Sequence, residues 1–120
     1  MNADPVVLAL GMPNPELDPS DADGVAVFAT GRPDMPNQIN STLAFPGIWR
    51  GLLDVRATEA SDDALMAAAC AVANVVVEEG ALSADYVVPS VFNKRLVPAV
   101  AEAVAEASRR SGSARITTSA

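Results

Sequence analysis

The chain has 120 residues, of which half are apolar and only 4% are aromatic, and its formal net charge is −7. This length allows at most one domain with a core of small side chains, and the excess of acidic residues makes nucleic acid and anionic membranes unfavourable partners. A single Cys and the absence of His exclude an internal disulfide and a zinc site of nitrogen and sulfur ligands, whereas oxygen-ligated Mg²⁺ or Mn²⁺ is compatible with the composition.

Two apolar runs near the N-terminus predict strands that are buried on both faces of a parallel sheet. They are VVLAL at residues 6–10 and VAVFAT at residues 25–30, and a Pro-rich loop follows each of them. The first run is too short for a signal peptide or a membrane span, and no basic segment precedes it, so we expect a cytoplasmic protein. In open α/β sheets, ligands bind at the carboxyl ends of the strands, where these two loops begin.

Three helices are predicted after the strands. The first begins near Pro46, a favourable first-turn position, and Phe45 and Trp49 are expected to anchor it in the core. Ser61 is expected to cap the second helix, which Gly80 ends. Residues 65–77 of that helix are apolar almost all round, which predicts burial between neighbours, including that of Cys70 as a small hydrophobe.

The last helix is predicted to begin between residues 93 and 97, after a short extended segment at residues 87–88. Pro98 is tolerated there only in the first turn, and Glu106 and Arg110 have the i, i+4 spacing of an ion pair. Gly112 is expected to end this helix, and residues 113–120 to fray.

The segment at residues 36–57 joins a polar, amide-rich loop to the start of the first helix. It reads PNQINSTLAFPGIWRGLLDVRA. Side-chain amides beside free helix N–H groups can hold a small anionic ligand. The segment is therefore the strongest candidate for a binding site.

This order of elements closely resembles the C-terminal part of the bacterial malic enzymes. The motifs that carry the likeness are DPVVLAL, TGRPD, PNQIN, FPGIWRGLLDVRA and YVVPS, and they cover nearly the whole chain. The resemblance implies a partial Rossmann-like, three-layer α/β nucleotide-binding fold with parallel strands and about three helices. On this basis residues 1–112 are the C-terminal segment of an NAD(P)-binding domain, and residues 113–120 are a frayed tail.

The family resemblance also implies an activity, the oxidative decarboxylation of malate to pyruvate and CO₂. In that family NAD or NADP accepts the hydride, and Mg²⁺ or Mn²⁺ polarises the substrate. The family's Tyr and Lys acid–base pair, its carboxylate metal ligands and its Gly-rich loop lie upstream of the matched segment. We therefore expect no catalytic residue and no metal ligand in this chain, and no activity of the chain alone.

Four residues are implied as substrate- or cofactor-binding positions. Asn40 matches an Asn that contacts malate beside the nicotinamide in the family. Ser41 and Met12 each stand where the family usually has an Asn, and Met12 cannot make the hydrogen bond of an amide. Asn14, two positions after Met12, could reach the site only if its loop shifted.

Other polar residues are better explained by structure than by chemistry. Tyr86 and Lys94, the only residues of their types, are expected to be a packed ring and a solvated amine. For Arg32, anion binding and pairing with Asp34 stay open. Solvated carboxylates rather than metal ligands are expected at Asp34, Asp54, Asp62 and Asp63.

Two functions from different classes follow. The chain is either the C-terminal segment of a malic enzyme, with the remainder of that enzyme as its partner and malate in the shared site, or a non-catalytic remnant that associates with itself through uncovered strand edges and apolar helices.

Overall fold

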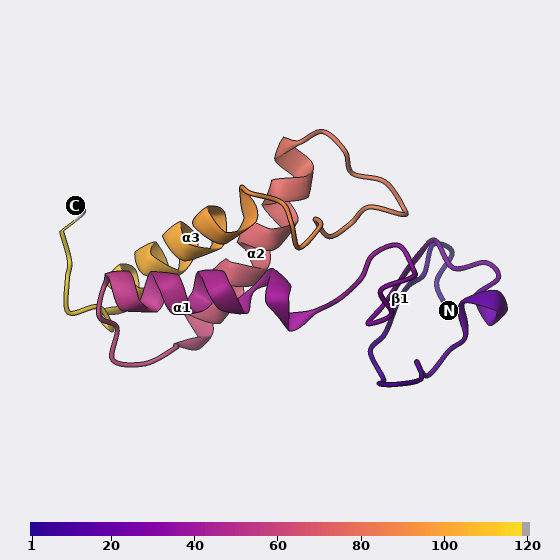
Figure 1. Cartoon of the computed structure of the whole chain (residues 1–120), viewed down its shortest axis with the longest axis horizontal. Helices are drawn as coiled ribbons and strands as arrows, with labels where there is room; N and C mark the ends of the chain where they lie inside the picture. The colour runs from indigo at the N-terminus through magenta and orange to yellow at the C-terminus, as the bar shows by residue number, and fades with distance from the viewer. Residues whose placement is uncertain (119–120) are drawn as a thin grey trace.

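A computed structural model describes residues 1–118 of the chain (Figure 1). The strands are β1 (Val6–Ala9) and β2 (Val27–Thr30), and the α-helices are α1 (Phe45–Asp54), α2 (Asp62–Glu78) and α3 (Leu96–Ser111). Two short 3₁₀ helices, η1 (Pro19–Asp21) and η2 (Ser41–Leu43), precede and follow β2. Parallel strands followed by three helices confirm the expected partial α/β fold.

The molecule is elongated, with principal extents of 50 × 28 × 27 Å. Figure 1 shows the cause, because the three helices form one lobe and the two strands with their loops form another at its end. The strands pack on each other rather than on the helices. The helices of this chain therefore do not cover the faces of its sheet.

The two strands are parallel and in the register Val6↔Val27 to Ala9↔Thr30. The expectation that both strands are buried on both faces is wrong for β1, where Val6 is 64% exposed and Leu8 is 55% exposed. The physical reason is that two parallel strands have no second layer here, although parallel sheets require cover on both faces. The continuous apolar pattern of β1 is therefore combined with exposed side chains in this structure.

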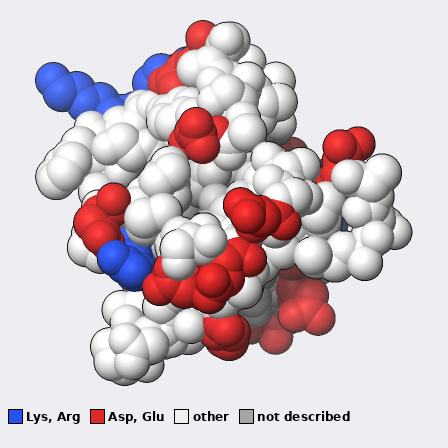
Figure 2. Space-filling model, turned by 90° about the vertical axis from the view of Figure 1, so that its right-hand side faces the viewer, with Lys and Arg blue, Asp and Glu red and all other residues white. Residues whose placement is uncertain are grey.

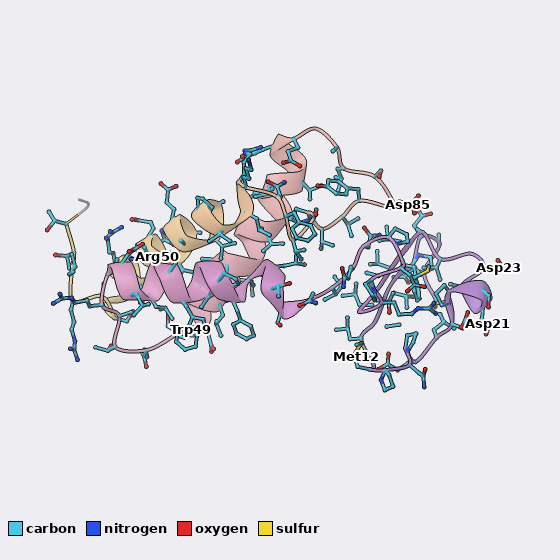
Figure 3. All side chains as sticks on the ribbon, viewed as in Figure 1. Met12, Asp21, Asp23, Trp49, Arg50 and Asp85 are labelled. Carbon is cyan, nitrogen blue, oxygen red and sulfur yellow. The ribbon has the colours of Figure 1, made fainter. Side chains whose placement is uncertain are left out.

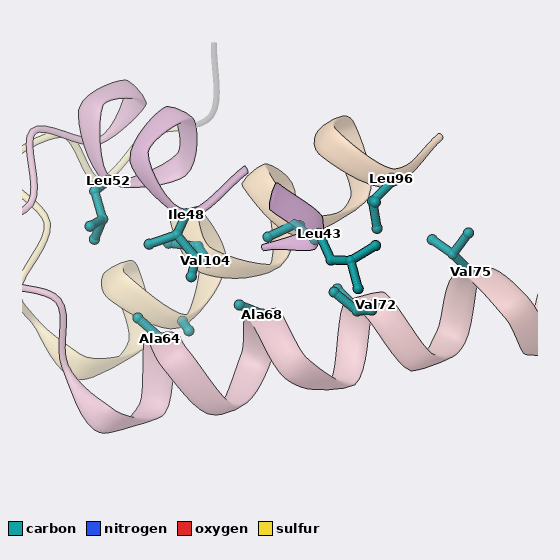
Figure 4. Packing of buried hydrophobic residues seen from close by; sticks show 12 residues of the cluster. Leu43, Ile48, Leu52, Ala64, Ala68, Val72, Val75, Leu96 and Val104 are labelled. Atoms are coloured by element: carbon teal, nitrogen blue, oxygen red, sulfur yellow. The ribbon is translucent and has the colours of Figure 1, made fainter. Parts of the chain in front are cut away.

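The main cluster of buried hydrophobic residues lies in the helical lobe (Figure 4). α1 crosses α3 closely because Gly47 and Gly51, one turn apart, face that helix without side chains. A Cβ atom added at Gly47 would lie 2.5 Å from Val100 Cβ. The other buried members of this core come from all three helices and η2; they include Leu43, Ile48, Leu52, Ala64, Ala68, Val72, Val75, Leu96 and Val104.

The second helix begins as predicted but is less buried than predicted. The Ser61 side chain accepts a hydrogen bond from Ala64 N and caps the helix. One face packs on the other helices, whereas the opposite face leaves Met66 66% exposed and Val77 56% exposed. Cys70 lies on that outer face and is exposed, so its expected burial is also wrong. The sequence of α2 is apolar all round because apolar residues occupy its exposed face as well as its buried face.

The first helix has a similar uncovered face. Its outer side carries Phe45, Trp49 and Leu53, which are 52%, 61% and 66% exposed. The expectation that Phe45 and Trp49 lie in the core is wrong, because Ile48 and Leu52 occupy the side that faces the helical lobe. Figure 3 shows Trp49 projecting away from α3.

The third helix ends at Gly112, which adopts the left-handed conformation with φ 79°. Pro98 falls in its first turn, and Arg110 Nη1 lies 3.6 Å from Glu106 Oε1, both as predicted. The short extended segment predicted at residues 87–88 is not a strand, because the chain there forms a turn and bends.

The residues after the third helix are not frayed where they can be described. Ala114 N donates to Ser108 O, and the N–H groups of Arg115 and Ile116 both donate to Val55 O at 3.0 Å. These bonds satisfy a carbonyl at the end of α1, which explains why the tail is held against the helical lobe. Residues 119 and 120, also predicted to fray, lie outside the described residues.

Acidic side chains outnumber basic ones on the face of the strand lobe (Figure 2). Asp21, Asp23 and Asp85 lie at this end of the molecule (Figure 3). Within residues 1–118, none of the helices is both long enough and apolar enough to cross a membrane.

Candidate functional site

A groove of about 280 Å³ lies where both strands end. The residues that follow β1 form one wall, and the residues between β2 and η2 form the other. Its lining residues are Leu10, Met12, Gly31, Ile39, Asn40 and Ser41. Three of the four predicted site residues therefore come together at the carboxyl ends of parallel strands, where α/β sheets bind ligands.

Asn40 presents an unused donor to this groove. Its Oδ1 accepts hydrogen bonds from Thr42 N at 2.9 Å and Thr42 Oγ1 at 3.0 Å, and so caps η2. Among residues 1–118 no hydrogen bond of its Nδ2 is found, and the residue is exposed. Because an amide NH₂ carries two donors, Asn40 can donate to a carboxylate while its cap stays intact.

The side chains beside Asn40 differ in what they offer a ligand. Ser41 is exposed and brings a hydroxyl to the groove, with a shorter reach than an amide. Met12 is 71% exposed and brings an apolar thioether, which lies over Gly31. Asn14 is exposed but does not line the groove.

A carboxylate clamp shapes the loop that carries Met12. Glu16 Oε2 accepts a hydrogen bond from Gly11 N at 2.9 Å. A Cβ atom at Gly11 would lie 2.8 Å from Asn14 O and 2.9 Å from Glu16 Oε1, so this close approach requires Gly. The backbone N–H of Gly11 stabilises the charged carboxylate and lowers the pKa of Glu16 below its ordinary value.

This clamp should open on acidification. Because the folded pKa of Glu16 is lowered, its stabilising contribution is fully present above the unfolded pKa and is lost as the pH falls through the folded pKa. We expect the Gly11 amide proton shift, measured by NMR, to titrate with a midpoint below the ordinary pKa of Glu. The titration should disappear in Glu16→Gln, and a midpoint at or above the ordinary value would contradict the clamp.

Arg32 is paired rather than free to hold an anion. Its Nε and Nη2 donate to the two carboxylate oxygens of Asp34 at 3.0 and 2.6 Å. The guanidinium lowers the pKa of Asp34, and the carboxylate raises the pKa of Arg32. Of the two roles left open for Arg32, the structure shows the ion pair.

The only Tyr and the only Lys lie away from the groove. Tyr86 is half-buried, and its hydroxyl donates to Glu79 Oε2 at 3.4 Å, whereas Lys94 is exposed. Neither lines the groove at the strand ends. In the part of the chain that the structure describes, no three His, Cys, Asp or Glu side chains gather as a possible metal site.

Asn37 is the residue near the groove that sequence reasoning missed. It is 5% exposed and has φ 55°, in the left-handed region that Asn tolerates better than most residues. Its side-chain amide bonds to three backbone groups in β2 and in the turn before α3. The available signal was an Asn directly after Pro36, a common turn pattern, but two of its three partners lie about 50 residues away in sequence.

Comparison with known proteins identifies what the chain is similar to. Residues 1–109 match the family model described as "Malic enzyme, NAD binding domain". The chain is 54% identical over 119 residues to the bifunctional malic/malolactic enzyme of Bacillus subtilis, which covers 98% of this chain and 29% of that protein. It is 52% identical over 116 residues to the NAD-dependent malic enzyme of Geobacillus stearothermophilus, covering 96% of this chain and 24% of that protein.

Solved structures agree with this similarity. The crystal structure of the malic enzyme from Pyrococcus horikoshii superposes with a TM-score of 0.91 at 44% identity, over 98% of this chain and 27% of that one. The Entamoeba histolytica malic enzyme gives a TM-score of 0.92 at 35% identity, over 97% of this chain and 24% of that one. The chain thus spans about a quarter of the length of these relatives.

Proposed function

Because the chain belongs to the malic enzyme family through its NAD-binding domain, we propose that it is the C-terminal segment of an NAD(P)-dependent malic enzyme. Such an enzyme converts malate to pyruvate and CO₂, and the segment contributes one wall of the site and is inactive alone. The observation that carries the proposal is the groove that places Asn40, Ser41 and Met12 together at the carboxyl ends of two parallel strands. A shared domain without this groove would support the fold alone.

The groove residues fit the binding of malate rather than the bond-breaking steps. The free Nδ2 of Asn40 donates to a malate carboxylate, and the hydroxyl of Ser41 supports the ligand beside it. The apolar side chains of Leu10 and Ile39 exclude water from the same groove and suit the face of a nicotinamide ring. When bound, the nicotinamide supplies the hydride acceptor.

The uncovered apolar faces support a larger partner. One face of β1 exposes Val6 and Leu8, and the outer side of α1 exposes Trp49 and Leu53, each by half or more of its surface. A two-stranded parallel sheet with such a face is marginal in water. We propose that the remainder of a malic enzyme covers these faces, because the chain spans only about a quarter of its relatives.

A chimera tests the proposal. In it, this chain replaces the matched segment of the Bacillus subtilis relative, and NAD or NADP reduction is followed with malate and Mn²⁺. We expect the chimera to oxidise malate and the isolated chain to give no rate above the blank. The unmodified relative is the positive control, and the relative lacking the segment is the negative control. Turnover by the isolated chain, or a folded chimera that does not bind malate, would overturn the proposal.

A second candidate function is that of a non-catalytic module that associates with itself. The same exposed residues of β1 and α1 favour it, because apolar patches and free strand edges promote association. Sedimentation of the isolated chain separates the two cases. A discrete oligomer that does not exchange with the complementary part of the relative supports self-association, whereas a chain that the complementary part captures supports the malic enzyme segment.

A further inference from the structure

The segment that carries Asn40 and Ser41 is fastened at only a few points. Ile39 N donates to Thr30 O at 2.8 Å, which holds it to the end of β2. Leu43, buried in the helical core, holds its other end. Between the two lobes the strands make little contact with the helices. Other contacts between the strand lobe and the helical lobe therefore determine how the groove is oriented.

The side-chain amide of Asn37 makes such a contact. Its Nδ2 donates to Phe28 O at 3.0 Å and to Ala84 O at 2.7 Å, and its Oδ1 accepts from Val87 N at 2.8 Å. Both donors and the acceptor of the amide are thus used, all on backbone groups. Phe28 belongs to β2, whereas Ala84 and Val87 belong to the turn between α2 and α3. One buried side chain ties a strand, the site segment and the helical lobe together.

We propose that Asn37 is a positioning residue of the substrate groove, an inference that rests on the proposed function. Its amide holds the site segment against the turn at residues 84–87, and so places Asn40 and Ser41 opposite the loop of Met12. The residue does not line the groove itself. Two features of Asn37 could matter, its left-handed backbone and its amide, and substitutions can separate them.

Three variants of the chimera make the separation. Asn37→Gly keeps the left-handed backbone at no steric cost but removes the amide. Asn37→Asp keeps the acceptor for Val87 N and places an oxygen against the carbonyls of Phe28 and Ala84. Asn2→Asp makes the same chemical change at an exposed residue that does not line the groove and is the matched control.

The readouts are peptide-level hydrogen exchange and the separate values of KM and kcat. For Asn37→Gly and Asn37→Asp we expect exchange at residues 84–90 and 38–43 to rise about tenfold or more, because local opening controls exchange. We also expect the KM for malate to rise about tenfold, the equivalent of losing one or two hydrogen bonds. A merely structural role would reduce the amount of active enzyme and lower the apparent kcat at unchanged KM.

Two results would overturn the proposal. One is unchanged exchange at residues 38–43 in Asn37→Gly, because the amide would then hold nothing. The other is raised exchange with an unchanged KM, because the amide would then stabilise the fold without positioning the site. If the unsubstituted chimera does not turn over malate, the proposed function is wrong independently of Asn37. The hydrogen exchange at residues 38–43 then decides alone whether Asn37 fastens the segment.

Discussion

Replacing Met12 by Asn in the chimera should raise kcat/KM for malate by about 10- to 100-fold, because a hydrogen bond to a charged ligand contributes about 1.5–3 kcal/mol. Met12 lines the same groove as Asn40 and is 71% exposed, so an Asn side chain can enter without repacking a core. The resemblance of this chain to the bacterial malic enzymes implies that members of the family usually carry an Asn at this position. The gain should fall mainly on KM if the bond is equally strong in the ground state and the transition state.

A matched variant separates hydrogen bonding from side-chain volume. Met12→Leu changes the shape but adds no donor, so its kcat/KM should stay within about twofold of the parent chimera. Adding Ser41→Asn to Met12→Asn should bring a further gain, because the longer amide reaches where a hydroxyl does not. If Met12→Asn and Met12→Leu behave alike, the position does not contact malate, and the assignment of this wall of the groove is wrong.

The sequence predicted which elements form and where the groove lies, but not which faces are buried. Strand and helix periodicity depends on the complete environment of a segment. Val6, Leu8, Trp49 and Met66 carry the pattern of buried residues but are exposed in this chain, and under the proposed function the remainder of the enzyme covers them. Within residues 1–118 no other segment covers them, so an apolar pattern and an exposed side chain coincide. Propensity and periodicity therefore identified the two strands and the three α-helices, but they also predicted an extended segment at residues 87–88 that does not form, and they overestimated the core.

Some residues of the candidate site could likewise be predicted from the sequence, and others could not. Met12, Asn40 and Ser41 were selected from sequence through the resemblance to the malic enzymes, and the rule that parallel strands end at one edge explains why the two loops that carry them meet. Asn37 could not be recognised, because its function depends on Ala84 and Val87, whose position relative to β2 no local pattern encodes. The family resemblance pointed to the groove residues, and only the tertiary structure revealed the hydrogen bonds that Asn37 makes beside them.

Gly51→Ala should destabilise the helical lobe by about 2 kcal/mol, and lower its Tm by roughly 6–10 °C. An added Cβ atom at Gly51 would clash with the backbone carbonyl of Ala101 and lie 2.9 Å from Val104 Cβ. Neither atom is the end of a flexible side chain, so α1 and α3 must separate. Because Ala prefers the helix to a greater extent than Gly does, the substitution also stabilises α1 by about 1 kcal/mol, which is less than the expected cost of overpacking against backbone.

Circular dichroism of the isolated chain during thermal unfolding measures this effect, and Leu53→Ala supplies the control. Leu53 lies on the same helix but is 66% exposed, so its truncation should change the Tm of the isolated chain by little. In the chimera the proposed partner covers Leu53. Leu53→Ala should therefore be destabilising there, although it changes the Tm of the isolated chain by little. A Gly51→Ala chain as stable as the parent would mean that α1 and α3 can separate freely, and the close crossing at Gly47 and Gly51 would not hold the lobe together.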